Sequence, residues 1–281
     1  GFAHATPFGI GRAGIGCGQA VNHPLATASL EDIEAYPWPD PMHVEVSGLK
    51  EQARAWDRQY AVLGGDWSPF WHDAIDLVGM ERLYLLMYDA PDMVDALLER
   101  VVDFYAESSR RIFDEAAGEI DIFFIGNDFG SQTGPLMSVE LFERFLLPHL
   151  RRLIRLGHDY GLPVQLHCCG GIEPLMPALI DAGLDALHAL QPDCHGMDPA
   201  SLKRSYGDRL VLNGGIDSHH VLIDGESPDF VRRKTVELLD IMTPGGGYIA
   251  GASHDSILEE TPVENVLAMF DAVQEYSIRE Y

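Results

Sequence analysis

Short apolar runs alternate with long amphipathic segments along most of this chain. The apolar runs cover residues 60–63, 120–125, 164–166, 186–190, 210–212 and 248–250, and helical periodicity covers residues near 71–88, 91–117, 138–160, 173–182, 198–206, 227–243 and 262–279. Buried strands that alternate with helices predict an α/β fold with a parallel sheet. Because the six strand candidates spread over most of the chain and no second composition regime indicates another domain, we expect a single TIM (β/α)8 barrel domain over residues 1–281.

The N-terminal segment departs from this pattern. Residues 1–45 are rich in Gly, Pro and Ala, and we expect them to be irregular apart from a short helix that Ser29 caps. The pattern leaves part of an eight-stranded barrel unaccounted for. We expect the remaining strands either in this segment or in an N-terminal region that the chain, which begins at Gly1, lacks. An open doubly wound sheet is the alternative, but no G-x-G-x-x-G motif follows the first strand.

Charge and cysteine content limit the partners and the compartment. The formal net charge is −25, whereas nucleic acids and anionic membranes attract basic surfaces. The 4 cysteines include an adjacent pair and do not resemble a secreted disulfide framework, so we expect the reducing cytoplasm. No apolar run has the length of a membrane span, and the start does not resemble a signal peptide.

The segment VQLHCCGG at residues 164–171 ends an apolar run in a histidine and two thiols. Alternate side chains of a strand share a face. His167 and Cys169 are therefore predicted to point one way, while Cys168 points the other way into the core. One neutral imidazole and one thiolate make half of a zinc site.

Polar residues follow every predicted strand. The clusters are Gly64-Gly65-Asp66, Gly126-Asn127-Asp128, His167-Cys168-Cys169-Gly170, Gln191-Pro192-Asp193-Cys194, Asn213-Gly214-Gly215-Ile216-Asp217 and Gly251-Ala252-Ser253-His254-Asp255. The active site of a TIM barrel lies at the carboxyl ends of its strands, so we expect these clusters to converge. None of them contains Arg or Lys, and the predicted site therefore suits a metal ion or a cation better than a polycarboxylate.

Three side chains compete to complete the site. His254 directly follows a strand and is the favoured third ligand, with general-acid catalysis as its other role. Cys194 lies further past its strand and ranks below His254. Asp128 could bind metal or substrate, or form a turn. Plainer interpretations hold for other polar residues: Asp217 as a helix cap, His188 as a core histidine, and His219 and His220 as solvated surface.

These stretches together resemble the uroporphyrinogen decarboxylase superfamily, which includes zinc-dependent, corrinoid-linked methyltransferases. The matching motifs are LHCCGG at 166–171, NGGID at 213–217, GGGYI at 245–249, SHDSI at 253–257 and TPVEN at 261–265, and the resemblance covers roughly residues 30 to 281. It implies a TIM barrel. His167 and Cys169 match the His-x-Cys pair that binds zinc, with a later Cys, in the methyltransferase branch. Near that third position this chain has His254, which resembles a histidine of the decarboxylase branch.

The resemblance implies a zinc-dependent methyltransferase or demethylase. It would move a methyl group between a small methylated substrate or thiol and a corrinoid (cobalamin) supplied by a partner protein, with a homodimer as one form of assembly. The implied roles are zinc binding for His167, Cys169 and His254, catalysis for His254 and Asp128, and substrate binding for Asp66, Asn127, Gln191 and Asp217. The alternatives are a metal-free decarboxylase, in which Asp128 or His254 would stabilise a protonated pyrrole, and a corrinoid-binding barrel without catalysis. The lack of basic residues at the strand ends weighs against the decarboxylase, whose substrate carries many carboxylates.

Overall fold

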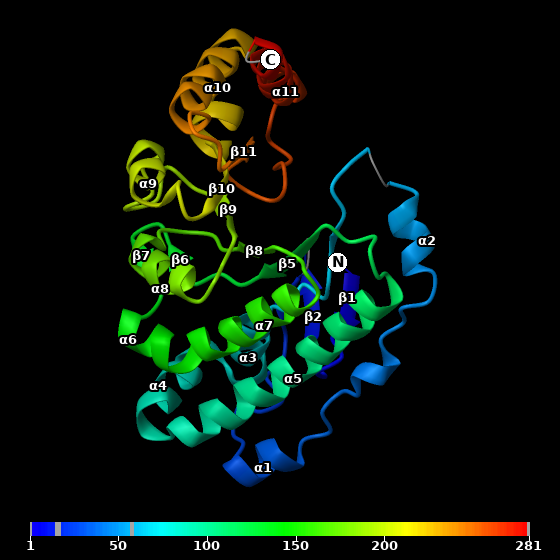
Figure 1. The fold of residues 1–281 in the computed structure, drawn as a ribbon. Coiled ribbons are helices and arrows are strands. Elements are labelled where there is room, and N and C mark those ends of the chain that lie inside the picture. Colours follow the sequence, from blue (N-terminus) through cyan, green and yellow to red (C-terminus); the bar gives the residue numbers. More distant parts are fainter. Residues whose placement is uncertain (1, 15–17, 57–58, 280–281) are drawn as a thin grey trace. The chain divides into compact units, whose positions relative to one another are not determined.

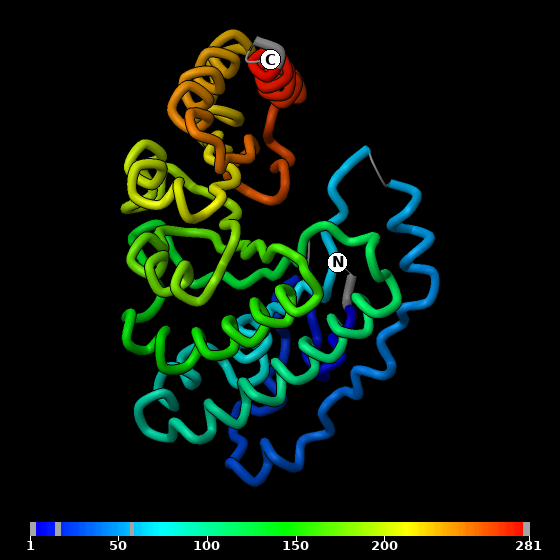
Figure 2. The backbone as a smooth tube through the Cα atoms, in the orientation of Figure 1, coloured from blue at the N-terminus to red at the C-terminus, as the bar shows by residue number. Residues whose placement is uncertain are grey.

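The computed structural model describes residues 2–14, 18–56 and 59–279. The chain divides into two compact units. Unit 1 comprises Gly1–Asn127 and Glu140–Val164, and unit 2 comprises Asp128–Val139 and Gln165–Tyr281. Figure 2 shows the path of the backbone through the residues that each unit contains.

Unit 1 begins with a small antiparallel sheet followed by helices (Figure 1). Its elements are β1 (Phe2–Ala5), β2 (Gly11–Gly14), β3 (Gln19–Ala20), α1 (Leu30–Ala35), the 3-10 turn η1 (Pro41–His43), α2 (Leu49–Arg54), β4 (Leu63–Gly64), α3 (Phe70–Val78), α4 (Met80–Asp89), α5 (Pro91–Glu115), β5 (Ile122–Gly126), the π-helix η2 (Phe142–Leu146) and α7 (Leu147–Asp159). The expected irregular segment 1–45 thus contains three short strands, because β2 pairs with both β1 and β3. Of this segment, residues 1 and 15–17 lie outside the described part.

Local sequence signals account for the helix boundaries of unit 1. Ser29 caps α1 as predicted, accepting a hydrogen bond from the backbone N–H of Asp32, whose side chain binds back to Ser29. The predicted helix 71–88 is instead two helices, because Gly79 has a φ of 95° and separates α3 from α4. Pro91 occupies the first turn of α5, where its missing N–H costs nothing.

The core of unit 1 forms beneath the parallel pair β4–β5. Leu63 pairs with Ile122 and Gly64 with Phe123. Phe123 is fully buried, and its ring packs edge-on against Phe113 of α5 with centroids 5.0 Å apart. Helix α7 packs along α5 in the same unit (Figure 1). The consecutive apolar residues of β5 therefore pack in the core, as expected for a strand of an α/β fold.

Unit 1 also buries an ionisable cluster. The carboxyl of Asp73 accepts a hydrogen bond from the hydroxyl of Tyr105, and its Oδ1 lies 3.9 Å from the guanidinium of Arg12. Burial raises the pKa of Asp73 to about 6, outweighing the Tyr105 hydrogen bond and the Arg12 charge, which lower it. Asp73 therefore binds a proton more tightly in the folded chain than in the unfolded chain.

This shift predicts a pH-dependent stability. Between an unfolded pKa of 3.8 and a folded pKa of about 6, the unfolded state loses the Asp73 proton first, so stability falls as pH rises through this window. The loss at pH 7 is at most about 3 kcal/mol. We expect Asp73→Asn to remove this decline, which urea unfolding at several pH values between 4 and 7 measures. Asp208→Asn, which changes a side chain 82% exposed, is the control and should keep the wild-type pH slope. Parallel pH profiles for Asp73→Asn and wild type would contradict the assignment.

Unit 2 is a series of strand–helix units. Its elements are β6 (Gly130–Ser131), β7 (Gly134–Pro135), β8 (Val164–His167), the 3-10 turn η3 (Glu173–Leu175), α8 (Met176–Asp181), β9 (Ala186–Leu190), α9 (Pro199–Tyr206), β10 (Val211–Ile216), the π-helix η4 (Ser218–Ile223), α10 (Pro228–Met242), β11 (Tyr248–Ala252) and α11 (Val263–Arg279), while α6 (Val139–Leu141) begins at its boundary. The strand order is β11-β10-β9-β8, and all neighbours are parallel. This arrangement confirms the predicted α/β class. The strands β8, β9, β10 and β11 lie within a few residues of their predicted ranges, whereas the short strands β6 and β7 were not predicted.

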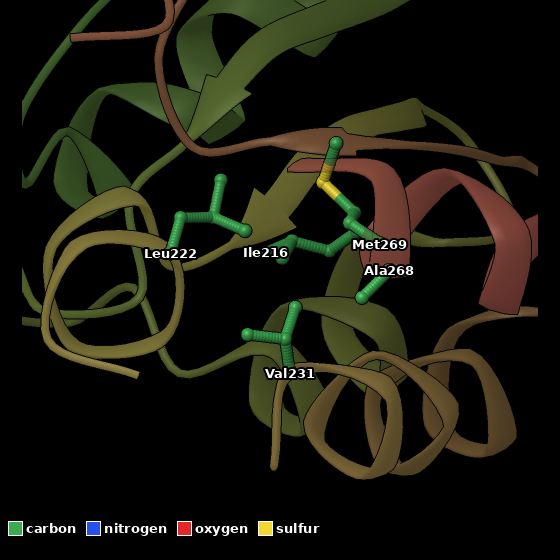
Figure 3. Packing of buried hydrophobic residues seen from close by; sticks show 5 residues of the cluster. All are labelled: Ile216, Leu222, Val231, Ala268 and Met269. Carbon is green, nitrogen blue, oxygen red and sulfur yellow. The ribbon is translucent and has the colours of Figure 1, made fainter. Parts of the chain in front are cut away.

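The last helices of unit 2 close over the end of β10. Figure 3 shows Ile216, Leu222, Val231, Ala268 and Met269 packed together, with exposed fractions of 4% or less. They come from β10, η4, α10 and α11, and α10 and α11 lie side by side (Figure 1). Burial of this apolar surface stabilises the packing of η4 against α10 and α11 at the carboxyl end of β10. Among the described residues, no helix combines the length and the apolarity that crossing a membrane requires.

Candidate functional site

A cavity of about 420 Å³ lies within unit 2, next to the carboxyl ends of β8, β9, β10 and β11. Its lining is small, polar and acidic, and consists of Asp128, Gly130, Ser131, Gln132, Cys169, Gly170, Gln191, Asp193, Ser218, His219, Ser253, His254 and Leu258. Four of the six predicted clusters contribute to it, and Asp128 is the residue from the cluster after β5. The strand ends of unit 2 therefore converge as the parallel sheet predicts.

The His-x-Cys pair has the predicted geometry. His167 ends β8, and its Nε2 lies 3.4 Å from the Sγ of Cys169. Cys168 points the other way, is fully buried, and accepts a hydrogen bond from the backbone N–H of Phe129 through its Sγ. The period of two thus separates the two adjacent thiols onto opposite faces, one toward the cavity and one toward the core.

Asp128 completes a group of three ligand types. Its Oδ1 lies 3.7 Å from Nε2 of His167 and accepts a 2.8 Å hydrogen bond from the backbone N–H of Cys169. One ligand atom from each of Asp128, His167 and Cys169 lies within 4.8 Å of the others. Donor atoms held at about 2.0–2.3 Å by one tetrahedral zinc ion are roughly 3.3–3.8 Å apart, so the distances from His167 Nε2 to the other two ligand atoms, and the O, N, S donor set, fit Zn²⁺.

Electrostatics at the cavity disfavour a free thiolate. Burial, followed by the negative charges of Asp128 and Asp255, raises the pKa of the Cys169 thiol far above its ordinary range. Cys169 therefore keeps its proton at neutral pH while no cation is near. A divalent cation bound at the three ligand atoms would reverse this preference, because its charge favours the thiolate.

His188 belongs to this site, although its position inside a strand predicts a core histidine. His188 and His167 occupy paired positions on the parallel strands β9 and β8, and their Nδ1 atoms are 2.9 Å apart. Burial, followed by the influence of His167, lowers the pKa of His188 to about 4, so its ring is neutral at pH 7. The sequence does place one histidine on each of two consecutive strands. Only the pairing register of these strands shows that the two side chains meet.

His254 lies in the cavity wall but not in the ligand group. Its Nδ1 is 3.0 Å from the carboxylate of Asp255 and accepts from the backbone N–H of Ser256. Within the described part of the chain, the three-residue ligand group contains Asp128 in the place expected for His254. The physical reason is local: the turn after β11 holds the His254 ring against its own backbone. Zinc binding by His254 therefore does not follow from this arrangement.

Cys194, the competing thiol, is also outside the ligand group. Its Sγ lies 3.6 Å from Oε1 of Gln191 and 3.8 Å from a carboxylate oxygen of Asp193. Burial and the Asp193 charge raise the pKa of Cys194 to about 11. The turn after β9 thus directs this thiol toward its own neighbours.

The residues predicted to bind substrate have different surroundings. Gln191 lines the cavity, and its Oε1 accepts a 2.6 Å hydrogen bond from the backbone N–H of Gly170. Asp217 caps η4 by accepting from the N–H groups of His219 and His220, as its plainer interpretation predicts. Asp66 and Asn127 belong to unit 1. Asp66 accepts from the Ser108 hydroxyl, and the buried amide of Asn127 accepts from Trp71 N–H and donates to the Ser68 carbonyl.

Ser253 belongs to a predicted cluster without a role of its own, and the sequence did not indicate that Ser218 or His219 lines the cavity. The backbone N–H of Ser218 donates to the hydroxyl of Ser253 at 2.9 Å, which joins the ends of β10 and β11. The His219 side chain is 57% exposed, as expected for a surface histidine, yet it faces the cavity and lies 3.9 Å from Asp193. Serines carry no distinctive spacing, so only the sheet could place them.

Comparisons with known proteins agree with this architecture. A methyltransferase from Methanosarcina mazei has a similar structure, with a TM-score of 0.73 at 21% identity over 96% of this chain and 77% of that one. Its likeness, together with the family match described next, shows that the fold is of the TIM-barrel class.

Curated relatives have two kinds of name. The methylated-thiol–coenzyme M methyltransferase of Methanosarcina mazei is 24% identical over 267 residues, which is 92% of this chain and 66% of that protein. The uroporphyrinogen decarboxylase of Syntrophotalea carbinolica is 26% identical over 192 residues, 67% of this chain and 50% of that protein. That of Pseudomonas aeruginosa is 25% identical over 263 residues, 89% of this chain and 69% of that protein. The chain thus spans between half and about two thirds of the length of these relatives, all of which are enzymes by name.

The family model described as uroporphyrinogen decarboxylase (URO-D) matches residues 15–276. This range includes most of both units, the HCC motif and every residue named above for the cavity lining. The chain therefore belongs to the uroporphyrinogen decarboxylase family.

Proposed function

We propose that this chain is the catalytic part of a zinc-dependent methyltransferase that moves a methyl group between a small methylated substrate or thiol and a corrinoid on a partner protein. The observation that carries the proposal is that ligand atoms of Asp128, His167 and Cys169 lie within 4.8 Å of one another, and that Asp128 and Cys169 line the cavity. The similarity to a methylated-thiol methyltransferase supports the same reaction class.

The three side chains would hold zinc and leave one coordination position for the substrate. When bound, zinc supplies Lewis acidity, which activates a thiol or polarises the heteroatom that carries the methyl group. The protein's own contribution is orientation. Asp128 accepts the N–H of Cys169, and Gln191 accepts the N–H of Gly170, so two side chains fix the backbone that carries the thiol. His254, half-buried in the cavity wall beside Asp255, is proposed as the group that exchanges a proton with the substrate.

The cavity favours methyl transfer over porphyrinogen decarboxylation. Its described lining contains the carboxylates of Asp128 and Asp193 and no Lys or Arg. A polycarboxylate would therefore meet negative charge without compensating cations. We propose a substrate that is small and neutral or cationic. Gln191 is the predicted substrate-binding residue that lines this cavity, whereas Asp66, Asn127 and Asp217 use their side chains in hydrogen bonds within the fold.

A methyl-transfer assay tests this function. Zinc-loaded protein is incubated with methylcobalamin and a panel of neutral, cationic and anionic thiols, and demethylation of the cobalamin is followed by its absorbance. We expect thiol-dependent turnover that is fastest with uncharged or cationic thiols and is lost after metal removal. Decarboxylation of a porphyrinogen without methyl transfer would overturn the proposal. Tight cobalamin binding with no turnover for any thiol would instead favour the binding role without catalysis.

Partner and compartment follow from the same proposal. A corrinoid protein is the proposed partner, because the described lining of the cavity contains no Lys or Arg that could bind the phosphate of a free corrinoid cofactor. Cys168, Cys169 and Cys194 are free thiols, and such thiols persist in a reducing compartment. The cytoplasm is therefore the proposed location.

A further inference from the structure

We propose that His188 is a positioning residue that accepts the Nδ1 proton of His167 and thereby keeps Nε2 of His167 available as a ligand atom. This inference rests on the proposed function, because it concerns the same zinc site. It assigns a role to a histidine that is neither one of the residues lining the cavity nor one of the three residues of the ligand group.

The sheet holds the two imidazoles in a fixed relation. His167 and His188 are register partners on the parallel strands β8 and β9, and the backbone N–H of Cys168 donates to the carbonyl of His188. The ring centroids are 5.0 Å apart, and the two Nδ1 atoms are 2.9 Å apart. His167 is only 5% exposed, so its ring has little room to turn. Packing and pairing therefore impose contact between the two Nδ1 atoms.

The contact between the two rings determines which ring nitrogen of His167 carries its proton. A neutral imidazole carries one N–H, and two facing Nδ1 atoms form a hydrogen bond only when one of them carries the proton. With the proton on Nδ1 of His167, its Nε2 presents a lone pair toward Sγ of Cys169 and Oδ1 of Asp128. With the proton on His188, the His167 proton sits on Nε2 and points at those same two atoms, where a metal ion would have to bind.

The first arrangement is the one that a metal site requires. Histidine ligands generally donate their second ring N–H to an acceptor, which fixes the tautomer and raises the basicity of the ligating nitrogen. The acceptor is commonly a carboxylate or a carbonyl oxygen. Here the group in that position is another imidazole, and its Nδ1 acts as the acceptor when its own proton lies on Nε2.

Two substitutions separate this role from simple packing. His188→Phe keeps a planar ring of similar size but has no nitrogen, whereas His188→Asn places an oxygen close to the Nδ1 position and can still accept. We expect His188→Phe to weaken zinc binding about 10- to 100-fold, as loss of a ligand's outer partner commonly does. His188→Asn should stay within about threefold of wild type. Zinc affinity is measured by competition with a coloured chelator, and circular dichroism checks that each variant is folded.

Ring ¹⁵N shifts of His167 in the metal-free protein give a readout that does not depend on zinc. Wild type and His188→Asn should show His167 protonated at Nδ1, and His188→Phe should lose that preference. Equal zinc affinity or an unchanged His167 tautomer in a folded His188→Phe protein would overturn the role of His188. Wild-type protein that binds no zinc would overturn the proposed function instead, and the tautomer of His167 would then decide the His188 assignment alone.

Discussion

Zinc bound to the purified protein is expected to disappear when His167 and Cys169 are both replaced by Ala. The double variant loses two of the three donor atoms that lie within 4.8 Å of one another, leaving Asp128 alone. A single carboxylate does not hold zinc at a protein site, so the affinity should fall by at least about 1000-fold. Methyl transfer should fall to background with it. Elemental analysis and chelator competition measure the metal, and the cobalamin assay measures the reaction.

Cys168→Ala is the matched control for this experiment. It removes the neighbouring thiol, which is fully buried and faces the core. We expect the zinc content of this variant to equal that of wild type. Its unfolding free energy should decrease by about 1–2 kcal/mol, because the hydrogen bond from the Phe129 N–H to the Cys168 sulfur is lost and a small cavity forms. Trace zinc in wild type that is the same in the double variant would eliminate the metal centre.

Gly170→Ala is expected to be the most damaging single substitution near the site. Gly170 has a φ of 91°, and a Cβ placed there would lie 2.4 Å from the carbonyl carbon of Gly130 and 2.6 Å from the backbone nitrogen of Ser131. Both obstacles are backbone atoms, so no side chain can move aside. Backbone strain and steric overlap together should lower the free energy of unfolding by about 3 kcal/mol or more. The displaced loop carries Cys169, and zinc affinity should therefore fall as well.

Gly245→Ala provides the comparison for backbone strain alone. Gly245 has a φ of 79°, but no atom lies within 4 Å of a Cβ built on it. We expect the free energy of unfolding to fall by only about 1 kcal/mol and zinc binding to stay unchanged. Urea unfolding and chelator competition on both variants distinguish the two cases. If Gly170→Ala is no less stable than Gly245→Ala, the close approach of Gly130 and Gly170 does not exist in solution.

Much of the fold can be predicted from the sequence, because strand and helix periodicities are local. The apolar run at 186–190 coincides with β9 (Ala186–Leu190), and Pro91 marks the first turn of α5. The predicted helices and strands were wrong in two places. Gly79 divides the predicted helix 71–88 into α3 and α4, and short antiparallel strands form in the first 20 residues. Such short strands carry little hydrophobic signal of their own.

The sequence alone determined that His167 and Cys169 share a face and that Cys168 does not, because a strand alternates its side chains whatever surrounds it. Only the tertiary structure decided which groups join that pair. Asp128 and His188 reach His167 through the loop after β5 and the register of β8 with β9, whereas His254 and Cys194 are held by their own turns. Contacts of this kind depend on strand pairing between residues far apart in the chain, and the spacing of residues along the sequence does not predict that pairing.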